Sequence, residues 1–87
     1  MSSKDKPAYK PNEHFMNQYT ATYLDGELLA ARMKFPNQDR TQLVNALIEE
    51  FLEMMRAIND NEGIERVRAE ALQVACVAVR IYEECDK

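Results

Sequence analysis

The segment that most constrains the fold is residues 71–79, "ALQVACVAV", which is apolar nearly all round when it is placed on a helix. Its central stripe follows helical spacing through Val67, Ala71, Val74, Ala78 and Ile81. A helix that is apolar on several sides has to be buried on several sides. The chain has only 87 residues, so its own core is modest. We therefore expect a partner chain to complete the core; the alternative is a three-helix monomer with a small core.

Two more helical segments precede this one. In the first, which starts at Glu13, the apolar residues Ala21, Leu24, Leu28, Ala31 and Phe35 recur with a period near 3.6. Gly26 favours a break or bend within it, because glycine weakens a helix. Pro36 ends the segment and pushes the preceding residue toward an extended conformation.

The second helix is expected to follow the connector "PNQDRT", with Asp39 or Thr41 as its N-cap, and to run to about Asn59. The predicted buried stripe consists of Leu43 or Val44, Leu47, Phe51, Met54 or Met55, and Ile58. The turn "NDNEG" separates it from the third helix, which is expected from Glu62 onward. Glycine is scarce and hairpin signals are missing, so no strand is predicted.

These segments predict an all-α fold, an antiparallel helical bundle of three main helices per chain that is completed by oligomerisation. Residues 1–12 are polar and hold two prolines, and we interpret them as a flexible N-terminal leader before a single domain at 13–87. The net charge of -4 argues against nucleic-acid binding, which requires a basic surface.

Neither a signal peptide nor an apolar run long enough to span a bilayer is visible. The two cysteines do not suggest a disulfide framework. We therefore expect a cytoplasmic protein with no membrane partner.

Acidic residues interrupt the apolar pattern at two places. Glu49, Glu50 and Glu53 lie on one side of the second helix at spacings where like charges repel, and Glu70 and Gln73 lie one turn apart on the third. If these helices pack antiparallel, the oxygen atoms of both sets converge between them. Hard oxygen ligands suit Mg²⁺ or Mn²⁺, and a cation relieves the repulsion of crowded carboxylates. The alternative is an ordinary solvated acidic face.

The amino-acid sequence around these residues resembles that of a known family. "EEFLE" fits the EExxE element of MazG-like nucleoside triphosphate pyrophosphohydrolases, in the all-α NTP pyrophosphatase superfamily, and Glu70 to Gln73 lies where their ExxD element is found. The stretches "AARMKFPNQDRTQLVNALIEEFLEMMRAI" and "RVRAEALQVACVAVRIYEECD" also look like MazG-like sequences. The resemblance covers roughly residues 28–86.

The resemblance implies roles for particular residues. Glu50, Glu53 and Glu70 match the metal-binding carboxylates, and Glu49 matches the glutamate that would hold the attacking water. Gln73 stands where the family has aspartate, so it would offer a metal ligand without charge. The implied activity is Mg²⁺-dependent hydrolysis of an NTP or dNTP to the monophosphate and pyrophosphate, in a homodimer or homotetramer.

Basic side chains near the acidic residues are candidate substrate-binding groups. Lys34, Arg66 and Arg80 could clamp phosphates, and the alternative for each is surface charge or an ion pair within a helix. The replacement at Gln73 also leaves open a catalytically weak or inactive MazG-like helical module that acts through protein interaction. A helical dimer without any site is a third possibility.

Overall fold

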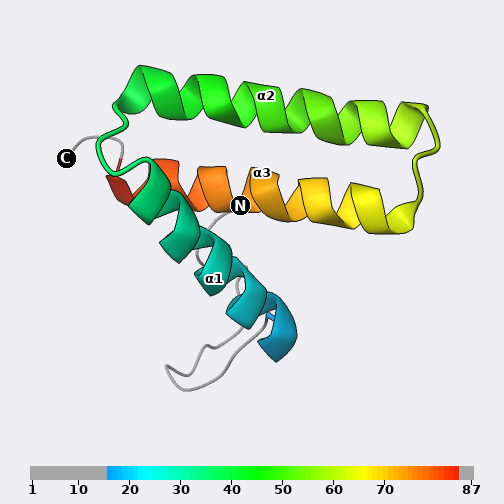
Figure 1. Cartoon of the computed structure of the whole chain (residues 1–87), viewed down its shortest axis with the longest axis horizontal. Coiled ribbons are helices and arrows are strands. Elements are labelled where there is room, and N and C mark those ends of the chain that lie inside the picture. Colours follow the sequence, from blue (N-terminus) through cyan, green and yellow to red (C-terminus); the bar gives the residue numbers. More distant parts are fainter. Residues whose placement is uncertain (1–15, 85–87) are drawn as a thin grey trace, which may run out of the picture.

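The structure is a computed structural model that describes residues 16–84, and within that range it has three helices and no strand. Helix α1 spans Gln18–Lys34, α2 spans Arg40–Asn59 and α3 spans Ile64–Glu84. Helices α2 and α3 lie side by side along their lengths and are joined by a short loop (Figure 1). Helix α1 packs obliquely on α3 and does not contact α2. The predicted leader at 1–12 lies outside the described residues.

Side-chain caps and a proline set the ends of α1 and α2. The side chain of Asn17 accepts hydrogen bonds from the backbone N–H groups of the first turn of α1. Asp39 caps α2 in a reciprocal box with Gln42, which resolves the choice between Asp39 and Thr41. Helix α1 ends just before Pro36, as predicted.

The apolar core is small and lies on both sides of α3. Leu24 and Leu28 of α1 pack with Cys76 of α3, whose side chain is buried. On α2, Leu43 and Ala57 are buried. Helix α1 continues through Gly26, so the break considered there does not occur.

The predicted buried stripes of α2 and α3 are correct only in part: Leu43 is buried, and Leu47 and Val74 are half-buried, but other members are exposed. On α2, Phe51 is 47% exposed and Ile58 is 46% exposed. On α3, Ala71 and Ala78 are exposed, while polar residues are buried in their place. The reason is that the positions of the neighbouring helices decide which side is buried: α1 and α2 pack on two sides of α3, and α2 packs on α3 alone. Arg80 is buried there because its side chain finds partners.

Arg80 is the clearest of these buried polar residues, at 3% exposed. Its Nη1 donates to Oε1 of Gln38 at 2.7 Å, and its Nη2 donates to the backbone carbonyl of Phe35 at 2.9 Å. It also pairs with Glu84, which Arg32 holds from α1 at 2.7 Å. Burial raises the pKa of Glu84, but hydrogen bonds from Arg32 and Arg80 outweigh it and leave this pKa below its usual value. This network ties the end of α1 and the connector to α3.

Candidate metal site

Three carboxylates meet where α2 faces α3. Glu50 and Glu53 come from one turn of α2, and Glu70 comes from α3. One oxygen of each residue lies within 4.8 Å of the others. Since like charges at this distance repel when they are partly shielded from water, a proton or a nearby positive charge stabilises the cluster.

Glu70 is the member that water reaches least, at 6% exposed. Its Oε1 accepts from Nη2 of Arg66 at 3.1 Å. Its Oε2 is buried and has no hydrogen-bond partner among the described residues. A buried carboxylate oxygen without a partner is costly, so this atom indicates a missing proton or cation.

Glu50 shows how the cluster responds without a cation. Burial, followed by the charges of Glu53 and Glu70, raises the pKa of Glu50 above its usual value. A proton on Glu50 can form a hydrogen bond with Glu70. Protons and cations therefore compete for the same group of oxygens.

The donor set fits Mg²⁺ or Mn²⁺. Both are hard cations that bind carboxylate oxygens, and Glu50, Glu53 and Glu70 supply such oxygens from two rigid helices. An exposed acidic face needs no ion, but this cluster includes a deeply buried member with a free oxygen. Glu49 is exposed and is not part of the three-carboxylate group.

Gln73 has a partner that the sequence analysis missed. Its Nε2 donates to Oε2 of Glu27 on α1 at 2.8 Å. Glu27 precedes buried Leu28 and lies three residues after buried Leu24, which places it at the edge of the buried face of α1. This position beside the buried face was the only sign in the sequence that Glu27 contacts a neighbouring helix. The bond places the carboxylate of Glu27 against Gln73, which itself lies one helical turn along α3 from Glu70.

The three predicted phosphate clamps lie in different surroundings. The side chain of Arg66 is 55% exposed and pairs with Glu70 of the cluster, so it lies beside the candidate site. Arg80 is buried in the α1–α3 network described above. The Nζ of Lys34 lies 5.3 Å from the ring centroid of Phe35, at the end of α1. Arg66 alone among the three contacts a carboxylate of the cluster.

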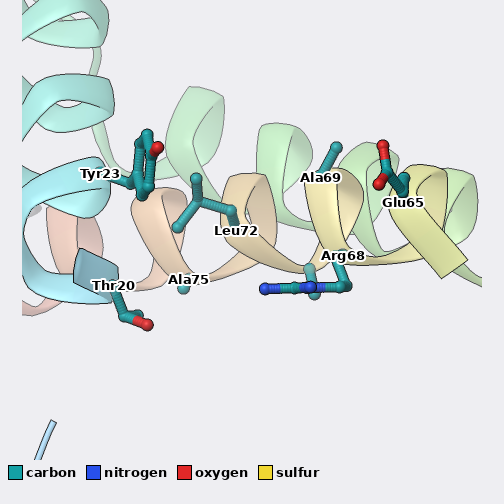
Figure 2. A pocket seen from close by; sticks show the side chains of 8 residues that line it. Thr20, Tyr23, Glu65, Arg68, Ala69, Leu72 and Ala75 are labelled. Carbon is teal, nitrogen blue, oxygen red and sulfur yellow. The ribbon is translucent and has the colours of Figure 1, made fainter. Parts of the chain in front are cut away.

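A separate shallow groove runs between α1 and α3. Figure 2 shows Thr20 and Tyr23 of α1 facing Leu72 and Ala75 of α3, with Arg68 extending toward α1. The residues that line the groove include none of the three clustered carboxylates. It is therefore a surface distinct from the candidate metal site.

Comparison of the chain with family models, curated proteins and solved structures gave no match. The resemblance to MazG-like enzymes therefore remains a prediction that rests on the quoted sequence stretches. None of the helices within residues 16–84 combines the length and the apolar character that crossing a membrane would require.

Proposed function

We propose that this protein is a Mg²⁺-dependent nucleoside triphosphate pyrophosphohydrolase of the MazG-like type, cytoplasmic and homo-oligomeric. The observation that carries the proposal is the buried, unpartnered Oε2 of Glu70 beside two further carboxylates. That arrangement suits a divalent cation better than it suits a solvated surface. The quoted EExxE-like and ExxD-like elements support a nucleotide triphosphate as the substrate.

In the proposed reaction, Glu50, Glu53 and Glu70 would hold Mg²⁺, with Mn²⁺ as a substitute. The ion would neutralise charge on the phosphate oxygens. Glu49 is exposed next to this group on α2 and would orient the attacking water. Arg66 would shift from Glu70 to a substrate phosphate, since its side chain is 55% exposed.

A second candidate function is a catalytically weak MazG-like module that acts through protein interaction. The observation that favours it is the bond from Nε2 of Gln73 to Glu27, which holds the side chain of Gln73 against α1, whereas the clustered carboxylates lie between α2 and α3. In that case the carboxylate cluster would bind a cation without turnover.

The test is a panel of NTPs and dNTPs with Mg²⁺ or Mn²⁺, scored by pyrophosphate release and compared with Glu53→Ala. Glu65→Gln is the matched control, because Glu65 is an exposed glutamate outside the cluster. Release that Glu53→Ala abolishes and Glu65→Gln leaves intact supports the enzyme. Metal binding by calorimetry without release from any nucleotide favours the second candidate. If the protein shows no metal binding and no pyrophosphate release, both candidate functions are refuted.

A further inference from the structure

The side of α2 that faces away from α3 carries a continuous apolar stripe. It consists of six residues that are each between 37% and 55% exposed: Val44, Ile48, Phe51, Leu52, Met55 and Ile58. Five of them follow the alternating spacing of four and three residues that places side chains along one line of a helix. Helix α2 contacts only α3 among the described helices, so nothing in residues 16–84 covers this stripe.

No charged residue lies within the stripe between Val44 and Ile58. Uncharged residues flank the stripe on both sides: Asn45, Leu47, Met54 and Asn59. Four of the five charged residues of α2 lie elsewhere around the helix: Glu49, Glu50, Glu53 and Arg56. Arg40 lies in line with Ile58, but it is the first residue of α2, one turn before Val44. A surface helix has no need of such an uncharged band, whereas the centre of a protein interface is depleted of charge.

We propose that the stripe of α2 packs against the same stripe of a second copy of this chain, with the two α2 helices antiparallel. The stripe extends seven residues to either side of Phe51, so a twofold axis near Phe51 matches it to itself.

The exposed area agrees with a small specific dimer. The stated exposed fractions correspond to roughly 500 Å² of apolar surface per chain, or about 1,000 Å² for the pair, which is near the lower bound of specific interfaces before the flanks are added. This inference does not rest on the proposed enzyme activity, because a protein without a metal site would present the same stripe.

Sedimentation and light scattering on the full chain give the first test. We expect a mass twice the 10.1 kDa of the chain for the wild type, and a monomer for Phe51→Glu or Ile48→Glu. Tyr23→Glu is the matched control, because Tyr23 is also an exposed aromatic residue but lines the α1–α3 groove shown in Figure 2. A monomeric wild type, or a dimer that Tyr23→Glu disrupts and Phe51→Glu does not, would overturn the proposal.

Cysteine coupling keeps the test decisive if the glutamate variants fail to fold. In a Cys85→Ser background under mild oxidation, Phe51→Cys is expected to form a covalent dimer at least tenfold faster than Tyr23→Cys. Val44→Cys is expected to couple with Ile58→Cys in a mixture, but not with itself. Efficient self-coupling of Val44→Cys would show a parallel pair and refute the antiparallel arrangement.

Discussion

Replacing Glu50 by glutamine tests whether the three carboxylates repel one another. Glutamine keeps the size of the side chain, removes its charge and offers an amide donor to the unpartnered Oε2 of Glu70. Without metal, we therefore expect Glu50→Gln to be more stable than the wild type. Most substitutions destabilise, so an increase is a specific result.

The separation of the oxygens sets the size of the effect. Two unit charges 4.8 Å apart repel by about 3.5 kcal/mol at an effective dielectric constant of about 20. Glu53 is exposed and water screens it, and a shared proton on Glu50 already relieves part of the repulsion. We expect about 1–2 kcal/mol to remain, which raises the melting temperature by about 4–16 °C in a domain of this size.

Thermal unfolding with a chelator and with Mg²⁺, at fixed protein concentration, measures this effect. Mg²⁺ at ten times its dissociation constant should stabilise the wild type by about 1.4 kcal/mol, with a much smaller gain for Glu50→Gln. The difference in melting temperature between Glu50→Gln and the wild type should therefore become smaller, or change sign, when Mg²⁺ is added. Glu49→Gln is the control: it removes a neighbouring glutamate outside the cluster and should change stability by less than about 0.5 kcal/mol without metal.

A neutral or destabilising Glu50→Gln in the chelator would refute the repulsion argument. An equal gain from Glu49→Gln would also refute it, since the benefit would then come from the net charge of -4 and not from the cluster.

Three further predictions address pH and the buried polar contacts. Folding raises the pKa of Glu50, so the free energy of unfolding of the metal-free wild type should fall as pH rises from about 4.5 through the folded pKa. Urea titrations at several pH values measure this fall, which should be absent in Glu50→Gln and suppressed by Mg²⁺. Arg80→Met should lower the free energy of unfolding in urea by about 2–4 kcal/mol, because Gln38 and a backbone carbonyl lose their donor; a loss under 0.5 kcal/mol would contradict a structural role. Gln73→Ala should cost about 1.5–3 kcal/mol by the same assay because Glu27 loses its donor, and an unchanged midpoint would show that this bond does not hold α1 in solution.

The sequence predicted the helices well and their buried faces poorly. Helical periodicity, Asp39 and Pro36 are local signals: Asp39 caps α2, Pro36 follows the end of α1, and the periodicity placed the end of α2 at about Asn59. Which side of a helix is buried depends on where its neighbours pack, and large apolar residues such as Phe51 do not report that. Completion of the core by a partner stays a prediction, but the structure moves the uncovered apolar surface from α3 to α2.

The candidate site was also predicted only in part, because some of its features depend on local spacing and others on how the helices pack. The spacing of Glu50 and Glu53 on one helix is local, so the sequence alone placed them on one side. Their approach to Glu70 depended on the assumption that α2 and α3 pack together, and the structure brings the three side chains together. Glu27 was missed because its role depends on how α1 crosses α3, which no spacing along the chain reveals.

Glu27 also explains the residue at position 73. An aspartate or glutamate there would place two carboxylates against each other at the contact between α1 and α3, where Gln73 instead donates a hydrogen bond of 2.8 Å. The amide thus satisfies an acceptor that α1 brings to this position. The negative charge that the MazG-like pattern carries at this position is present one side chain further away, on Glu27. The departure from the pattern at Gln73 thus has a structural reason in the contact between α1 and α3, while the three clustered carboxylates between α2 and α3 are unaffected by it.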